Sequence, residues 1–471
     1  MRKYIIIILF GLFNFILSCN NDFSEDLDTK FSSGEADFSR YVALGGSFTS
    51  GFRDNALYIS GQNESFPLIV AEQMKRIGGG DFRSPYMADD LGGISEAKVD
   101  NKKILVVSEG SLTPITSPGE GTTTLTNIYS QSFYQNMGIP GAKSFHLTAA
   151  GYGNPLNLFS KKANPYFVRF ASNPNSTALE DAIAQDPTFF SLWIGINDVL
   201  GYATSGGDGS NVITDISTFQ NVYTKLIETL VSKSAKGVVA NLPDITDFPY
   251  FNKITPKPFK ANQFTLEQIK KLNASYKSYN DGLDQAKANH IISAEELTAR
   301  KIIFVEGQAN GAVIIDKDLT NLDSMRLPSI RMSNSGDLFL LSVSLILKAG
   351  GGTSKPIEDQ YVLTDKEIIN IREAIKAYNH IIENLAKQYN LAYTNIQSLV
   401  SQLKTKDGVI YDGVNYTNQF ITGGFFSLDG IHPTGRGYAF IANEFIKAIN
   451  QKYGSNLPLV NPNIYQSVKF P

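Results

Sequence analysis

The chain has only one cysteine and four histidines among its 471 residues. A single cysteine cannot close an internal disulfide, and the sequence lacks the CxxC, HExxH or clustered His/Cys patterns that hold metal ions. A charge imbalance is missing as well, since 42 Lys and Arg face 45 Asp and Glu, for a formal net charge of −3. Because binding to a phosphate backbone needs a basic surface, we expect no nucleic-acid partner. The missing ligand motifs likewise predict that the protein has no metal centre.

Apolar residues are plentiful, at 42% of the chain. This fraction is typical of a globular protein with a sizeable core. At about 150 residues per domain, the length corresponds to about three domains, or to one enlarged domain with long insertions.

The amino terminus has the pattern of an export signal. Arg2 and Lys3 precede an apolar run over residues 4–17, which turns polar directly after Cys19. The run is shorter than the roughly 20 residues that cross a bilayer as a helix, so we expect it to be removed. An ordinary signal peptide with a chance cysteine near its cleavage site, or an uncleaved anchor, are the alternatives.

Residues 16–19 resemble a bacterial lipoprotein signal. The resemblance implies a signal peptide over 1–18 and a lipid on Cys19, which would hold the protein to a membrane. The polar, acidic stretch that follows predicts a flexible tether over 19–38. We therefore expect an exported bacterial lipoprotein, anchored at the outer membrane or the cell surface.

The rest of the chain alternates short apolar runs with amphipathic segments. The runs at 41–44, 189–194, 237–240 and 391–396 predict strands that are buried on both faces, and the periodic segments at 66–77, about 219–230, 266–286, 365–388 and 437–451 predict helices. Strands of this kind between helices indicate a mostly parallel sheet with helices on both sides. The expected fold class is therefore α/β, a three-layer αβα sandwich.

Two segments, at about 52–135 and 250–362, do not follow this alternation and predict long insertions. The second contains a nearly continuous apolar run at 338–347. We interpret this run as a buried strand or helix, with an apolar wall of a substrate cleft as the alternative.

Four short segments carry candidate chemistry. Ser47 follows the first strand between glycines, where a nucleophile would be accessible. Asp429 precedes His432 by three residues, a spacing that lets a carboxylate reach an imidazole Nδ1. Asn197 follows the strand at 189–194, at the edge where α/β sheets bind ligands, and residues 136–142 supply a glycine turn whose N–H groups are possible oxyanion donors.

In this order the four segments resemble the blocks of the SGNH (GDSL-type) hydrolase family. The resemblance implies a flavodoxin-like hydrolase domain over 39–455, with a C-terminal tail over 456–471. It implies a Ser47–His432–Asp429 triad and an oxyanion hole from Ser47, Gly141 and Asn197. Gly138 competes with Gly141 for this role, and the alignment of the block favours Gly141. Gly46 departs from the family, which often has Asp there.

The activity implied is ester hydrolysis by an esterase or lipase, without a cofactor or metal. The ester substrate would be a lipid or an acylated glycan. A carbohydrate O-acetyl esterase and a surface lipoprotein that binds ligand without turnover are the alternatives. The remaining histidines, His146, His290 and His380, match no block, and we expect them to have ordinary surface or packing roles.

Overall fold

The structure is a computed structural model that describes residues 31–471. The expected signal peptide, Cys19 and the first part of the tether lie outside the described residues. The last part of the expected tether is ordered, because Ala36 and Phe38 are buried in the main core and the Phe38 ring packs edge-on against Phe189 at 4.9 Å. The prediction of a flexible tether through residue 38 is therefore wrong for its last residues.

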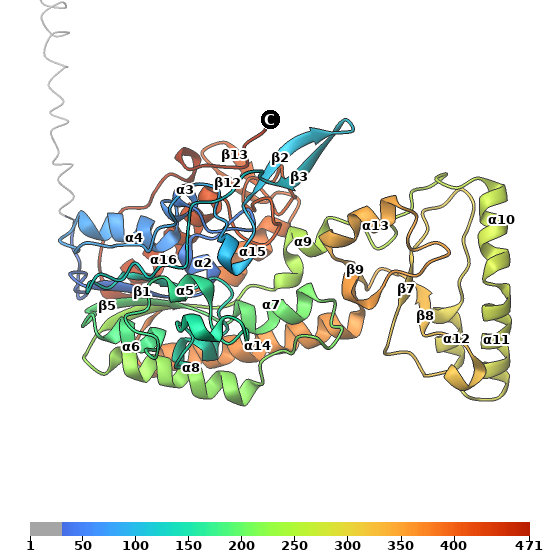
Figure 1. The fold of residues 1–471 in the computed structure, drawn as a ribbon, viewed down its shortest axis with the longest axis horizontal. Helices are drawn as coiled ribbons and strands as arrows, with labels where there is room; N and C mark the ends of the chain where they lie inside the picture. The colour runs from blue at the N-terminus through green and yellow to red at the C-terminus, as the bar shows by residue number, and fades with distance from the viewer. Residues whose placement is uncertain (1–30) are drawn as a thin grey trace, which may run out of the picture.

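A five-stranded parallel sheet forms the centre of the molecule (Figure 1). The four predicted strands are confirmed, and a fifth short strand forms where only a turn was expected, at residues 136–138. Every residue of the first strand and of the strand at 189–193 is buried, as expected when both faces are covered. The strands are β1 (Tyr41–Gly45), β4 (Asn136–Gly138), β5 (Phe189–Trp193), β6 (Lys236–Ala240) and β11 (Ala392–Thr394).

Helices cover both faces of this sheet, which confirms the three-layer αβα sandwich. On one face lie α4 (Phe66–Lys75) and α16 (Gly435–Tyr453), which pack against each other. On the other lie α6 (Ala178–Ile183), α8 (Ile216–Val231) and α14 (Asp365–Gln388) (Figure 1).

The strand order is β11-β6-β5-β1-β4, all parallel. In chain order this is the 2-1-3-4-5 arrangement of flavodoxin-like folds. The connections that leave β1 and β5 run to opposite sides of the sheet, so the switch point of the topology lies between the carboxyl ends of these two strands. Ligands bind at this switch point in open α/β sheets.

Short helices follow the strand ends, and further elements complete the sandwich. The helix that follows β5 was not predicted. These elements are α2 (Ser47–Ser50), α3 (Ile59–Gln62), α5 (Pro165–Val168), α7 (Ile196–Thr204), α9 (Pro249–Asn252), α15 (Ile396–Lys404) and the hairpin β12 (Val409–Tyr411) with β13 (Val414–Tyr416).

The segment 52–135 is only in part outside the sandwich. It contains α4, whose Phe66, Ile69 and Val70 are buried in the main core. Beyond α4 it runs mostly as loops and forms a projecting hairpin of β2 (Lys103–Ser108) and β3 (Ser111–Thr116) (Figure 1).

The segment 250–362 largely forms a lobe beside the sandwich, with an apolar core of its own (Figure 1). The helix expected over 266–286 is two helices that break at Tyr276, which is not helical. The apolar run 338–347 is divided between a strand, a turn and a helix, and Leu345 is 75% exposed. The elements are α10 (Leu266–Ser275), α11 (Lys277–Ala288), α12 (Ala294–Arg300), β7 (Val313–Ile315), β8 (Ile330–Met332), β9 (Leu338–Phe339), α13 (Ser344–Lys348) and β10 (Val362–Leu363).

Among residues 31–471, none of the helices is both long and apolar enough to cross a membrane.

Candidate active site

Ser47 is the first residue of α2, directly beyond the carboxyl end of β1. The chain turns sharply here because Gly45 has no side chain. A Cβ at Gly45 would lie 2.2 Å from Thr49 Oγ1 and 2.5 Å from the Trp193 carbonyl oxygen, so no other residue fits. The turn places the Ser47 hydroxyl at the switch point between β1 and β5.

His432 and Asp429 reach Ser47 from the loop that precedes α16. The hydroxyl oxygen of Ser47 lies 2.8 Å from His432 Nε2, and His432 Nδ1 lies 2.9 Å from Asp429 Oδ2. In the tautomer with its proton on Nδ1, the imidazole donates to Asp429 and accepts the Ser47 hydroxyl. The structure thus brings together three residues that the sequence analysis singled out separately.

The environment keeps the Asp429 carboxylate ionised. Burial raises the pKa of Asp429, but the charge of His432 and hydrogen bonds from His432 and Ile431 outweigh it and lower the pKa to about 2. One oxygen accepts the Ile431 and His432 backbone N–H groups, each at 2.8 Å. The carboxylate is therefore charged and fixed in orientation at neutral pH.

Two aromatic rings enclose the imidazole. The ring centroids of Phe48 and Phe52 lie 4.9 and 4.8 Å from that of His432, which is 7% exposed. Both rings come from the segment that begins at Ser47. They limit the access of water to His432 and hold its ring plane toward the serine.

Backbone N–H groups are free to act as donors beside Ser47. Among the described residues, no hydrogen bond takes up the N–H of Ser47 or that of Gly141. Gly141 is exposed and has a φ of 80°, in the left-handed region that favours glycine. Such groups can stabilise a developing oxyanion.

The structure distinguishes Gly141 from Gly138. Gly138 lies within β4 beside Gly45, and its N–H already donates to Asn136 Oδ1 at 3.0 Å. A Cβ at Gly138 would lie 2.3 Å from the Ser50 nitrogen, so this glycine serves close packing beneath α2. Gly141, with its unused N–H, is the better candidate donor.

Asn197 follows the strand β5, as expected, and lies in the first turn of the helix α7. Its side-chain amide donates to the Ala142 carbonyl at 3.0 Å. A Cβ at Gly46 would lie 3.4 Å from the same Nδ2 atom, which places the amide beside the backbone that leads into Ser47. The second N–H of this amide remains for a ligand.

Two buried polar contacts fix the loop that carries Gly141, and the sequence analysis missed both. Asp198 accepts the Ser144 backbone N–H and hydroxyl, at 2.8 and 2.7 Å. Asn164 donates to the Pro140 carbonyl at 2.8 Å. Asp198 lies in the same block as Asn197, but no local pattern points to its partner Ser144 or to the partner of Asn164, because both partners come from distant segments.

The other histidines are far less suited to catalysis. His146 is stacked on Tyr152 at 4.4 Å, and burial with the charge of Lys143 lowers its pKa to about 4. His290 is exposed, and His380 contacts Asn384 on the surface of α14. Within residues 31–471, no group of three or more His, Cys, Asp or Glu side chains is arranged to hold a metal ion.

No protein-family model matches the chain, and no curated protein sequence matches it. Among solved structures, the chain is similar to Axe2, an acetylxylan esterase from Geobacillus stearothermophilus, at 9% identity and a TM-score of 0.36 over 89% of this chain and 98% of that chain. It is also similar to LAE5, an α/β hydrolase enzyme from the metagenome of Lake Arreo, Spain, at 10% identity and a TM-score of 0.34 over 88% and 96% of the two chains. The acetyl xylan esterase AlAXEase matches at 14% identity and a TM-score of 0.26 over 66% and 78%. These sequence identities and TM-scores are too low to assign the activity of these proteins to this chain.

Proposed function

We propose that this protein is a serine-dependent hydrolase of carboxylic esters. The observation that supports this most directly is the continuous contact from Ser47 Oγ to His432 Nε2 at 2.8 Å and from His432 Nδ1 to Asp429 Oδ2 at 2.9 Å. A serine, its base and the group that orients the base are the parts that acyl transfer requires.

In the proposed reaction His432 removes the hydroxyl proton as Ser47 attacks the ester carbonyl. Asp429 stabilises the imidazolium that forms. The N–H groups of Ser47 and Gly141 and the Asn197 amide bind the oxyanion of the tetrahedral intermediate. The imidazolium then protonates the leaving alcohol, and water activated by the same base releases the acid from the acyl-enzyme.

The three side chains are in continuous hydrogen-bond contact from Ser47 through His432 to Asp429. Ligand binding alone does not require a buried, ionised Asp429 that is hydrogen-bonded to a histidine in contact with a serine. This arrangement favours catalysis over the alternative of a non-catalytic surface lipoprotein.

The experiment is hydrolysis of p-nitrophenyl acetate, butyrate and a long-chain ester, and of acetylated xylan, by the protein and by its Ser47→Ala variant. We expect Ser47→Ala to lower kcat by about 10⁴- to 10⁶-fold. Ser160→Ala, at an exposed hydroxyl that donates only to a loop carbonyl, is the control and should leave kcat unchanged. A long-chain preference would indicate a lipase, and turnover confined to acetyl groups would indicate a carbohydrate O-acetyl esterase. No Ser47-dependent turnover on any of these would favour ligand binding.

We also propose, from the sequence alone, that Cys19 carries a lipid that anchors the protein to a membrane. The Cys19→Ser variant should then move from the membrane fraction to the soluble fraction of the exported protein. Equal membrane retention of both proteins would contradict the anchor.

A further inference from the structure

A tight turn over residues 53–56 contacts the carboxylate of Asp429. Arg53 and Ala56 exchange two backbone hydrogen bonds, of 3.1 and 3.0 Å. The two residues between them, Asp54 and Asn55, have φ values of 53° and 66°. Positive φ at both central positions is the pattern of a type I′ turn, and Asp and Asn tolerate it better than other side chains.

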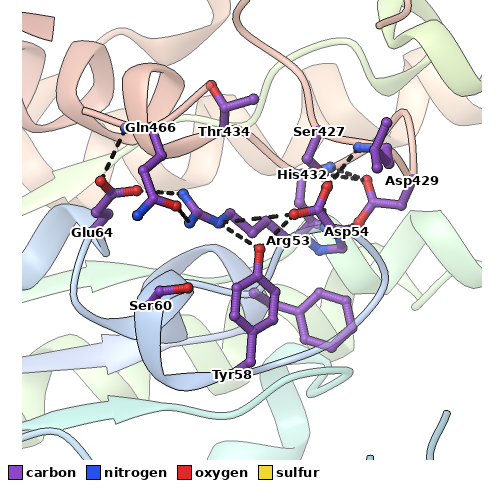
Figure 2. Close-up of polar contacts among 12 residues, drawn as sticks. Arg53, Asp54, Tyr58, Ser60, Glu64, Ser427, Asp429, His432, Thr434 and Gln466 are labelled. Carbon is purple, nitrogen blue, oxygen red and sulfur yellow. Dashed lines mark hydrogen bonds and ion pairs between the residues drawn. The ribbon is translucent and has the colours of Figure 1, made fainter. Parts of the chain in front are cut away.

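This turn holds Asp429 through its backbone. The N–H of Asn55 donates to Asp429 Oδ2 at 2.9 Å, so it shares that oxygen with the imidazole of His432. The N–H of Asp54 donates to Ser427 Oγ at 2.9 Å, and that hydroxyl donates to Asp429 Oδ1 at 3.2 Å. Both carboxylate oxygens of Asp429 therefore depend on the position of this turn. Figure 2 shows Asp54 beside Ser427 and Asp429.

The side chain of Asp54 ties the turn to the catalytic loop. Asp54 Oδ1 accepts the N–H of Leu428, the residue before Asp429, at 2.9 Å. The contact joins residues 374 positions apart in the sequence. The turn thus holds the loop that carries Asp429 at two points, through its backbone N–H groups and through the Asp54 carboxylate.

A buried chain of donors orients Asp54 in turn. The Tyr58 hydroxyl donates to Asp54 Oδ2 at 2.5 Å, and Arg53 Nε donates to the Tyr58 oxygen at 2.8 Å. Arg53 is 3% exposed and binds Glu64 at 2.5 Å and Gln466 at 2.9 Å with its remaining nitrogens (Figure 2). Asp54 therefore accepts a buried hydrogen bond on each carboxylate oxygen, from Leu428 on Oδ1 and from Tyr58 on Oδ2.

We propose that Asp54 is a positioning residue that acts through Asp429, with Tyr58 and Arg53 fixing its orientation. The inference rests on the proposed function, since it assigns Asp54 a part in aligning the same triad. Asp54 does not touch the serine or the imidazole. Loss of its carboxylate lets the Leu428–Asp429 backbone shift, which misaligns Asp429 against His432 and weakens the base that activates Ser47.

The test measures the rate at which a fluorophosphonate labels Ser47. In this reaction Ser47 Oγ bonds to phosphorus, fluoride leaves and His432 takes the hydroxyl proton, so the rate reports the alignment of the triad without an ester substrate. We expect Asp54→Asn to slow labelling by about 10- to 100-fold, as misplacement of a catalytic group by about 1 Å can do. Tyr58→Phe should slow it by about 2- to 10-fold, the effect of one lost hydrogen bond.

Two comparisons separate positioning from general stability. Asp215 also accepts backbone N–H groups, from Ser217 and Thr218 at the start of α8, without contact to the triad. Asp215→Asn should label at the natural rate. In an Asp429→Asn background, Asp54→Asn should cause less than about a twofold further change, because effects that act through one residue are not additive.

Labelling of Asp54→Asn at the natural rate, or a full additional loss in the Asp429→Asn background, would overturn the positioning role. If Asp54→Asn does not fold, as judged from its melting curve, Tyr58→Phe decides the question by the same criterion. Absence of Ser47 labelling in the natural sequence would instead refute the proposed function and, with it, this inference.

Discussion

The carboxylate of Asp198 accepts both the backbone N–H and the hydroxyl of Ser144, at 2.8 and 2.7 Å, in a site from which solvent is excluded. Asp198 follows the oxyanion candidate Asn197, and Ser144 lies three residues beyond the candidate Gly141. The contact therefore sets the distance between two donors that belong to different segments of the chain.

This contact predicts the effect of Ser144→Ala. Burial raises the pKa of Asp198, and the hydrogen bonds from Ser144 lower it. Removal of the hydroxyl leaves a buried carboxylate oxygen with fewer donors, which costs about 1 to 3 kcal/mol of unfolding free energy. We expect chemical denaturation to show this loss and kcat to fall while KM changes little. Unchanged stability would mean that water replaces the hydroxyl.

Asn197→Ala tests the oxyanion hole. Removal of one donor typically lowers kcat by about 10²- to 10³-fold, because the donor stabilises charge that develops only in the transition state. Asn280 is a matched control, since its amide also donates to a backbone carbonyl, that of Ile302 at 2.9 Å, but in the separate lobe. Steady-state kinetics should show the loss for Asn197→Ala alone. A rise in KM at constant kcat would assign Asn197 to ground-state binding.

Asp429→Asn tests the carboxylate that orients His432. The pKa of Asp429 is lowered to about 2, so this carboxylate is ionised throughout the neutral range and can stabilise the imidazolium that forms during the reaction. Replacement by the neutral amide should therefore lower kcat by about 10⁴-fold in steady-state kinetics at neutral pH. An unchanged kcat would contradict the role of Asp429.

Glu367, in the first turn of α14, predicts a pH-dependent stability. Burial raises its pKa from 4.5 to about 7, against the lowering effect of hydrogen bonds from Thr364. Between these two values the folded protein holds a proton that the unfolded chain releases, so this residue makes stability fall as pH rises from about 4.5 to 7. Glu367→Gln keeps an acceptor for the Thr364 N–H and removes the charge.

The melting temperature of Glu367→Gln, relative to that of the natural sequence, should therefore increase from pH 5 to pH 8. Ionisations elsewhere in the chain cancel in this difference. A difference that stays constant across the range would show that Glu367 titrates normally in the folded state.

The layered fold could be predicted because its signals are local. The apolar runs at β1 and β5 predict strands buried on both faces, and the amphipathic periods of α8 and α14 predict their packing faces. The break at Tyr276 and the helix that begins at Ile196 were not predicted. Both depend on how neighbouring segments pack, which overrides weak local preference.

The sequence by itself determined the residue types of the site and their order along the chain, because Ser47, Asn197, Asp429 and His432 each lie in a short recognisable segment. Only the tertiary structure decided which of them meet, since Ser47 and His432 are 385 positions apart. It also showed that the N–H of Gly138 is already bonded while that of Gly141 is not, among the described residues, and it revealed the contacts of the Asp54 turn with Asp429. Strand order and long-range hydrogen bonds set these contacts, and no local pattern encodes a partner that lies hundreds of residues away.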